Sequence, residues 1–340
     1  MKAHVPQEQP DAGDEEVHDD WRLFKGDGRA RQSTFPKAPP WRRFDSAGAD
    51  GQRGERPYLI GPAEVDVVNA ALLLRRPLLV TGHPGTGKSS LAYAIAHELS
   101  LGGVLHWPVN SRTTLQEALY SYDAIGRLRE ANMRRDPRGD QDVSAEEPDI
   151  GSYVRLGPLG TALVPSAIPR VLLVDELDKG DVDLPNDLLN VFEEGEFEIP
   201  ELSRLAEERS SVRVRTAASS VWTDVERGHV RCSEFPVVVI TSNGERDFPP
   251  AFLRRCVRLD LPEPDEERLR AIISAHLHLG SGDTNTDGMD ELLRAFLARR
   301  ARGELATDQL LNAVFLRRGG VDLDADGLLD AVLHSLGRTV

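Results

Sequence analysis

Apolar residues follow two different patterns along the chain, and the change between them divides the sequence. From about residue 57 to residue 263, short apolar runs bounded by turn residues alternate with segments of helical period. Such runs are typical of buried strands, and their alternation with helices predicts a parallel sheet with crossover helices. The predicted strands are 77–81, 103–109, 171–174 and 237–241, and the predicted helices include 63–75 and 89–99.

From Asp265 onward the apolar residues recur only with the spacing of helices. One helical face is formed by residues 269–277, and similar faces recur at 292–297, 310–315 and 328–336. The predicted fold class is therefore α/β, with an αβα sandwich at 57–263 followed by a small all-α domain at 264–340.

The first 56 residues look like a flexible tail. Positions 1–20 hold seven acidic residues against one lysine, and the stretch that follows is rich in glycine, proline and arginine. Such a composition buries too little apolar surface to offset the entropy of ordering. Five aromatic residues are the exception. We expect them to dock a partly ordered arm on the body, and the alternative is a partner-binding segment: Trp21, Phe24, Phe35, Trp41 and Phe44.

Composition narrows the function classes. The 340 residues carry a formal net charge of −15, which argues against non-specific binding to nucleic acid or to an anionic membrane. Cys232 and Cys256 are the only cysteines, so a disulfide framework or a structural zinc site is not expected. No apolar run approaches the ~20 residues that span a bilayer, and the acidic N-terminus lacks an apolar signal core. We expect a cytoplasmic protein.

Residues 82–89, GHPGTGKS, match the phosphate-binding pattern G-x-x-x-x-G-K-[ST] between a predicted strand and a predicted helix. Glycines let backbone N–H groups converge on phosphate oxygens, and the helix N-terminus adds positive potential. Lys88 places a cation at the β- and γ-phosphates, and the Ser89 hydroxyl can ligate Mg²⁺. The predicted nucleotide-binding residues are Gly82, His83, Pro84, Gly85, Thr86, Gly87, Lys88, Ser89 and Ser90.

Acidic residues follow the predicted strand 171–174, and an amide follows the predicted strand 237–241. Carboxylates at the carboxyl edge of a parallel sheet lie over the nucleotide crevice. Asp175 is placed to hold Mg²⁺ together with Ser89, and Glu176 is placed to polarise a water for attack on the γ-phosphate. Asn243 would orient that water if its strand neighbours the strand of Asp175. About ten residues further on, Arg254 and Arg255 offer a cation for the transition state.

Taken together, these segments resemble the AAA+ ATPases, and most closely the MoxR family. The resemblance covers about residues 57–317 and rests on an ordered set of motifs. These are the Walker A motif GHPGTGKS, the Walker B motif VLLVDELDK, the sensor-1 segment VVVITSNGE and the arginine-finger stretch PPAFLRRC. The segments RLGPLGTAL and DLLNVFEEGEFEIPEL resemble further parts of this clade, the second being a helix followed by a hairpin.

The resemblance implies a Mg²⁺-dependent ATPase with a helical lid at 264–340. It implies a ring, usually of six subunits, with ATP at each subunit interface and a protein substrate or a von Willebrand factor A domain partner. The implied catalytic residues are Lys88, Glu176, Asn243 as sensor 1, and Arg255 as the finger, with Arg254 as its less favoured substitute. The lid departs from the family, because Asp308 and Gln309 stand where a sensor-2 arginine is expected. Either Arg300 or Arg302 serves instead, or the lid contributes little charge.

Two other functions remain open at this stage. The irregular lid motif is compatible with a nucleotide-dependent scaffold that binds ATP and assembles but hydrolyses it slowly. A P-loop kinase for a small molecule is disfavoured, because paired acids after the strand favour hydrolysis and because the sequence offers no acceptor site.

Overall fold

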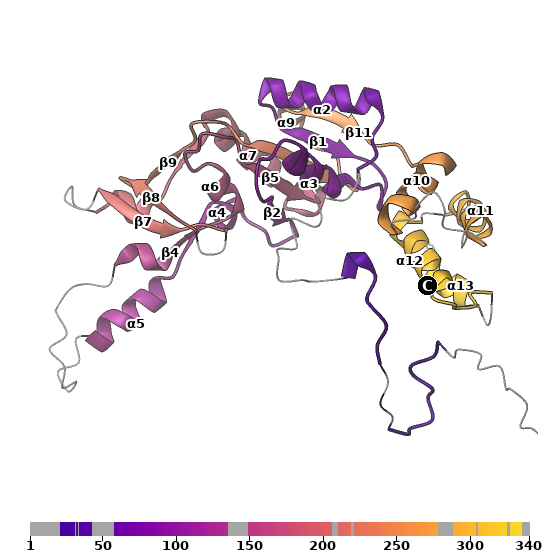
Figure 1. Ribbon diagram of the computed structural model, residues 1–340. Coiled ribbons are helices and arrows are strands. Elements are labelled where there is room, and N and C mark those ends of the chain that lie inside the picture. Colours follow the sequence, from indigo (N-terminus) through magenta and orange to yellow (C-terminus); the bar gives the residue numbers. More distant parts are fainter. Residues whose placement is uncertain are drawn as a thin grey trace, which may run out of the picture.

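A parallel sheet of five strands forms the centre of the fold (Figure 1). The computed structural model describes residues 21–30, 32, 34–42, 58–134, 149–205, 210–218, 221–277, 288–303, 305–324 and 327–334. The strand order is β11-β1-β10-β5-β2, and every pair is parallel. The strands are β1 (Leu78–Thr81), β2 (Leu105–Pro108), β5 (Val171–Asp175), β10 (Val237–Ser242) and β11 (Val257–Asp260).

The four strands predicted from apolar runs are confirmed, and β11 is an addition. Its sequence, VRLD, alternates polar and apolar residues, and its central side chains are exposed at Arg258 and buried at Leu259. As an edge strand it lacks the continuous buried run of the three central strands β1, β10 and β5.

Successive side chains of the sheet enter two separate apolar clusters. One cluster joins Val80, Leu173 and Val239 to α2 (Pro62–Leu74) and α3 (Lys88–Glu98). The other joins the alternate residues Leu172, Val174 and Ile240 to the opposite face. Helices on that face are α6 (Pro158–Ala162), α7 (Leu184–Glu194) and α9 (Pro250–Leu253). This arrangement is the predicted αβα sandwich.

A second sheet of six strands lies beside the core and was not predicted as a unit (Figure 1). Its order is β3-β4-β7-β8-β9-β6, and only the β4–β7 pair is parallel. The strands are β3 (Tyr120–Tyr122), β4 (Val154–Leu156), β6 (Glu196–Glu198), β7 (Ser211–Arg215), β8 (Trp222–Glu226) and β9 (His229–Arg231). Small helices accompany it: α4 (Leu115–Leu119), α5 (Ala124–Arg134), η2 (Ile150–Tyr153) and α8 (Pro200–Ser203). A further short helix, η3 (Leu177–Lys179), follows β5 and contacts β10 of the central sheet.

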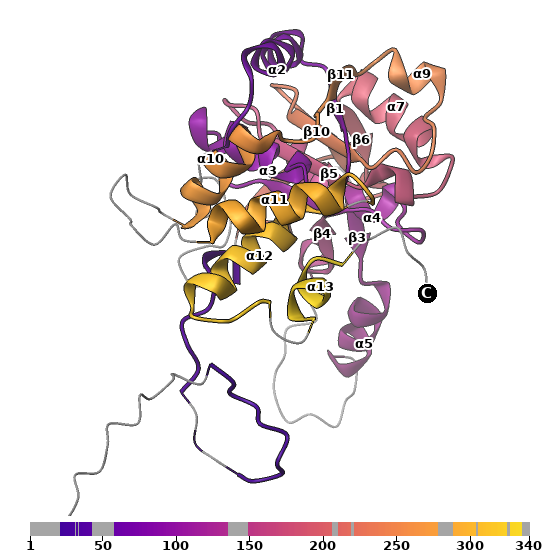
Figure 2. The same ribbon diagram turned by 90° about the vertical axis from the view of Figure 1, so that its right-hand side faces the viewer.

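Four helices form the all-α lid, which lies at the end of the core away from the second sheet (Figures 1 and 2). They share a cluster that contains Leu269, Phe296 and Leu310. The helices are α10 (Glu266–Leu277), α11 (Met289–Arg300), α12 (Thr307–Arg318) and α13 (Leu328–Val332). The longest helix among the described ranges, α2, has 13 residues, and none of those helices is both long and apolar enough to cross a membrane.

One of the five aromatic residues of the N-terminal arm, Trp41, docks on the lid as expected. Trp41, in the short helix η1 (Pro40–Arg42), packs edge-on against Phe315 of α12 with ring centroids 5.7 Å apart. Its indole Nε1 donates to Asn312 Oδ1 at 3.1 Å. By contrast, Trp21, Phe24 and Phe35 are exposed. Phe44 and the acidic positions 1–20 lie outside the described residues.

The two-sided core makes a stability prediction. Leu173 is fully buried in the central strand β5, so Leu173→Ala should lower the free energy of unfolding by about 2–5 kcal/mol. The matched control Leu73→Ala, on the 85% exposed side chain of α2, should change it by less than about 0.5 kcal/mol. Urea unfolding followed by circular dichroism measures both, and equal effects would contradict this placement of the core.

Candidate active site

The phosphate-binding loop joins β1 to α3 and has the backbone geometry that its glycines predict. Gly82, Gly85 and Gly87 have φ values of 146°, 78° and 86°, in a region that side chains with a Cβ rarely adopt. At Gly85 a Cβ would also lie 2.7–2.8 Å from atoms of Ala306 and Thr307 in the lid. Glycine at this position therefore allows the start of α12 to lie directly against the loop.

Lys88 lies across this loop. Its buried Nζ donates to the carbonyl oxygens of Gly82 at 2.7 Å and His83 at 2.9 Å. Burial lowers the pKa of Lys88, although nearby carboxylates act in the opposite direction. The Nζ group can exchange these neutral acceptors for phosphate oxygens, which are stronger partners for a charged donor.

Ser89 and Asp175 meet at the carboxyl edge of the central sheet. The Ser89 hydroxyl donates to Asp175 Oδ1 at 2.6 Å, the Thr241 hydroxyl donates to the same oxygen at 2.7 Å, and His106 Nε2 lies 3.2 Å from Oδ2. Burial alone would raise the pKa of Asp175, but the hydrogen bonds from His106, Ser89 and Thr241 outweigh it and lower the pKa to about 2. A hydroxyl beside an ionised carboxylate is a donor set that suits Mg²⁺.

Glu176 and Asn243 lie in contact, as the sequence predicted for strands that are neighbours. Asn243 Nδ2 donates to Glu176 Oε1 at 3.3 Å, and Lys179 Nζ lies 2.8 Å from Oε2. The Glu176 backbone has a φ of 59°, a left-handed conformation that is rare for residues other than glycine. Its N–H donates to the Thr241 hydroxyl at 2.8 Å, which holds this turn against β10.

Asp178 is a site residue that the sequence interpretation missed. Its side chain is almost fully buried, and its Oδ2 accepts the backbone N–H groups of Asn243 at 2.9 Å and Glu245 at 3.1 Å. The other oxygen, Oδ1, is buried without a hydrogen-bond partner in the described part of the chain. Asp178 thus fastens the loop that carries Asn243 to the turn that carries Glu176. The only sequence signal for Asp178 was a second acid close after Glu176 and next to Lys179.

The two candidate finger arginines, Arg254 and Arg255, follow directly after α9. The Arg255 guanidinium bonds to the Glu193 carboxylate of α7 and donates to the carbonyl of Ala251 at 3.1 Å. Arg254 is exposed, and its backbone carbonyl accepts from Arg76. Within the described residues the structure therefore pairs Arg255 with α7 instead of with the phosphate-binding loop.

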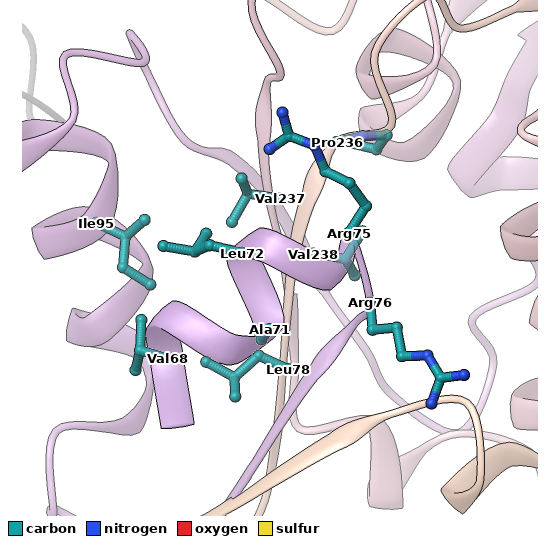
Figure 3. Close-up of a pocket in the computed structure, with 10 residues that line it drawn as sticks. All are labelled: Val68, Ala71, Leu72, Arg75, Arg76, Leu78, Ile95, Pro236, Val237 and Val238. Carbon is teal, nitrogen blue, oxygen red and sulfur yellow. The ribbon is translucent and has the colours of Figure 1, made fainter. Parts of the chain in front are cut away.

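A cavity of about 390 Å³ lies between the phosphate-binding loop, the segment at Tyr58 and Leu59, and the lid. Loop residues Gly85, Thr86, Gly87, Ser89 and Ser90 line one side, and Arg268, Ile272, His276, Thr307, Asp308 and Leu311 line the lid side. A second cavity, beneath α2, has only about 10 Å³ and at most holds one water (Figure 3). The cavity of about 390 Å³ has room for a ligand beside the phosphate-binding loop, and a larger one of about 710 Å³ lies apart from that loop, at His106, Arg155 and Arg170.

The lid arginine at this cavity is Arg268, which sequence reasoning did not consider. Its Nη2 donates to the Leu59 carbonyl at 2.6 Å. Arg300 instead pairs with Glu263 at 3.4 Å and lies over the Phe296 ring, and neither it nor Arg302 lines the cavity. Gln309 is buried and caps its own helix by accepting from the Ala306 N–H at 3.0 Å. The sequence did not single out Arg268, because tertiary packing decides which face of α10 meets the cavity, here the face that Arg268 shares with Ile272 and His276.

Comparison with known proteins identifies a family whose match includes the phosphate-binding loop and the strands before Asp175 and Asn243. The family described as AAA domain (dynein-related subfamily) matches residues 77–256, more than half of the chain. Similar solved structures include a candidate ATPase from Cytophaga hutchinsonii ATCC 33406, with 10% identity and a TM-score of 0.34 over 64% of this chain and 55% of that one. They also include NtrX from Brucella abortus with ADP, with 14% identity and a TM-score of 0.41 over 83% of this chain and 56% of that one. The chain thus spans a little over half the length of these structures, and no curated protein matches it.

The fastening role of Asp178 can be tested without an activity assay. Asp178→Ala removes the acceptor of the Asn243 and Glu245 N–H groups, and hydrogen bonds to a charged group contribute about 1.5–3 kcal/mol. Hydrogen exchange at these two amides should therefore become about 10–100 times faster, as measured by NMR. Asp181→Ala, an exposed acid three residues away, is the control and should leave both amides protected. Unchanged exchange in Asp178→Ala would contradict the assignment.

Proposed function

The chain belongs to the AAA domain family, in its dynein-related subfamily, and on this premise we propose that it is a MoxR-like AAA+ ATPase that hydrolyses ATP, assembles into a ring, and remodels or activates a protein partner. The observation that carries this proposal is the convergence of five side chains at one edge of the central sheet. These are Lys88, Ser89, Asp175, Glu176 and Asn243.

The residues present fit a Mg²⁺–nucleotide complex. Gly82, Gly85 and Gly87 bring no side chain between the loop backbone and a phosphate, and their positive φ values are ones that residues with a Cβ rarely adopt. Lys88 binds phosphate oxygens, and Ser89 with the ionised Asp175 offers the oxygen ligands for the cation. A Mg²⁺ ion held by Ser89 and Asp175 would neutralise part of the charge of the nucleotide's phosphates.

Glu176 and Asn243 are placed to act on the attacking water. Glu176 is the only carboxylate in the described site that Asn243 contacts through its side chain, and the amide can orient a water that the carboxylate deprotonates. Because both oxygens of Glu176 already have partners, in Asn243 and Lys179, the carboxylate is held at a defined position before substrate binds. The base of the nucleotide fits the 390 Å³ cavity between the loop and the lid.

Ring assembly explains an arginine that its own chain leaves at a distance from the chemistry. Arg255 is tied to α7 through Glu193, and in this proposal it completes the site of a neighbouring subunit. The proposed assembly is a hexamer, and the proposed partner is a protein substrate or a von Willebrand factor A domain. The proposal includes a cytoplasmic location.

Shared active sites predict that ATPase activity depends on protein concentration. Specific activity should rise as the protein is concentrated, because dilute subunits lack the neighbour's arginine. Arg255→Ala should lower kcat at least tenfold, since a positioned arginine contributes up to about 10³–10⁵ in rate. Arg254→Ala is the matched control and should retain most of the activity. Steady-state phosphate release across a wide concentration range measures this, and a substantial activity independent of concentration would contradict the shared site.

Glu176→Gln should separate binding from hydrolysis. The variant should bind a fluorescent ATP analogue as tightly as the wild type, whereas kcat falls about 10²–10⁴-fold because the general base is lost. Lys88→Ala should lose binding itself, because the buried cation at the phosphates is removed. If the wild type binds ATP and assembles without hydrolysing it, the nucleotide-dependent scaffold is the better description. Transfer of phosphate to a small acceptor would instead indicate a kinase.

A further inference from the structure

The segment 21–42 has a charge opposite to that of the rest of the chain. It holds six basic residues and one acid, Asp27, which gives it a net charge of +5. Residues 43–340 carry a net charge of −14. The basic residues are Arg22, Lys25, Arg29, Arg31, Lys37 and Arg42. An extended basic segment on an acidic protein is attracted to acidic surfaces of the same kind of protein.

Three aromatic side chains of this arm face solvent. Phe24 is 87% exposed, Phe35 is 81% exposed and Trp21 is 40% exposed. Large aromatic side chains are enriched at protein interfaces, where they supply contact area with little loss of conformational entropy. Trp41 shows that an aromatic residue of the same arm does pack where an apolar site is available, on Phe315 of the lid. Phe24 and Phe35 therefore resemble interface residues that lack their partner surface, whereas the ring of Trp21 is partly covered by the Arg22 guanidinium, 5.4 Å from its centroid.

The arm is rooted on the lid but extends away from it. Both views show the chain running from η1 away from the lid and the core and then turning back in a wide loop (Figures 1 and 2). The arm is attached to the lid at Trp41, which packs on Phe315 and donates a hydrogen bond to Asn312. The 18 residues from 21 to 38 span up to roughly 60 Å when extended, at about 3.3 Å per residue. That length exceeds the radius of gyration expected for a compact chain of this size, about 20 Å, so a neighbouring molecule is within reach.

We propose that residues 21–38 form an assembly arm that docks on the acidic surface of a second copy of this chain. The basic side chains provide the attraction, and Trp21, Phe24 and Phe35 provide the buried contact. A second copy is favoured over nucleic acid because the remaining chain is strongly acidic and repels a phosphate backbone. The inference rests on the proposed ring assembly and names a segment that holds the subunits together.

The root of the arm also places it close to the nucleotide. Helix α12 carries Asn312 and Phe315, which hold Trp41, and its first residues Thr307 and Asp308 line the nucleotide cavity. These groups lie within about two turns of one helix. The arm of one subunit therefore starts from the element that covers its own nucleotide site, so arm docking bears directly on the position of the lid.

Sedimentation velocity of the full chain across a range of concentrations tests the proposal. One variant combines Trp21→Ser, Phe24→Ser and Phe35→Ser, and another combines Arg22→Glu, Lys25→Glu and Arg29→Glu. Each should raise the midpoint concentration for assembly at least tenfold. A conservative control combines Arg22→Lys, Arg29→Lys, Phe24→Tyr and Phe35→Tyr and should assemble like the wild type. Raising the salt concentration should weaken wild-type assembly more than assembly of the charge-reversed variant.

The possible outcomes distinguish failure of the arm proposal from failure of the ring proposal. If the wild type assembles and both disruptive variants assemble at the same concentration, the arm proposal is wrong while the ring proposal stands. If the wild type remains monomeric at every concentration with ATP present, both are wrong. If the variants assemble normally but lose binding of a labelled single-stranded oligonucleotide that the wild type binds, the arm recognises nucleic acid and the proposal is overturned. Thermal unfolding of the dilute, unassembled chain should be unchanged in all variants, because the substituted side chains are exposed.

Discussion

The parallel pairing of β5 with β10 is the constraint on which the candidate site depends. Val174 lies opposite Ile240, so the residues that follow on the two strands emerge side by side. The Thr241 hydroxyl then joins the strands' ends, because it donates to Asp175 and accepts from the Glu176 N–H. A shift of one residue in this register would move Asp175 away from Ser89 and place an apolar side chain at the phosphate-binding loop.

Three sets of contacts hold the elements around the carboxyl edge of the central sheet in place. Asp178 fixes the loop after β10 through two backbone N–H groups. Gly85 allows Ala306, at the start of α12, to pack directly against the phosphate-binding loop. A movement of the lid away from the loop would break this contact. Arg268 ties α10 to the chain segment before α2 through the Leu59 carbonyl. The groups around the nucleotide cavity are thus positioned by elements that lie far apart in the sequence.

The sequence predicted those parts of the structure that have a fixed local signature. The phosphate-binding loop has a fixed spacing, and Glu176 and Asn243 were placed together because buried parallel strands end at one edge. Asp178 could not be assigned, because its role depends on where the backbone after β10 returns. The second sheet was missed because strands such as β7 are short and bury only alternate residues, here Val212 and Val214. The departure in the lid was visible, but only the structure shows that Gln309 caps its own helix while Arg268 faces the cavity.

The charge around the candidate nucleotide site bears on the proposal that a second subunit completes it. A nucleoside triphosphate brings several negative charges to an edge that already holds Asp175, Glu176 and Asp178. Within the described part of one chain, Lys88 is the cation on the phosphate-binding loop itself, and its pKa is lowered by burial. Lys179 is engaged with Glu176, and Arg255 with Glu193. In the proposed function, charge that develops on the γ-phosphate during hydrolysis would be neutralised by a divalent cation and by Arg255 of a neighbouring subunit, in addition to Lys88 and to Arg268 at the cavity of the same chain.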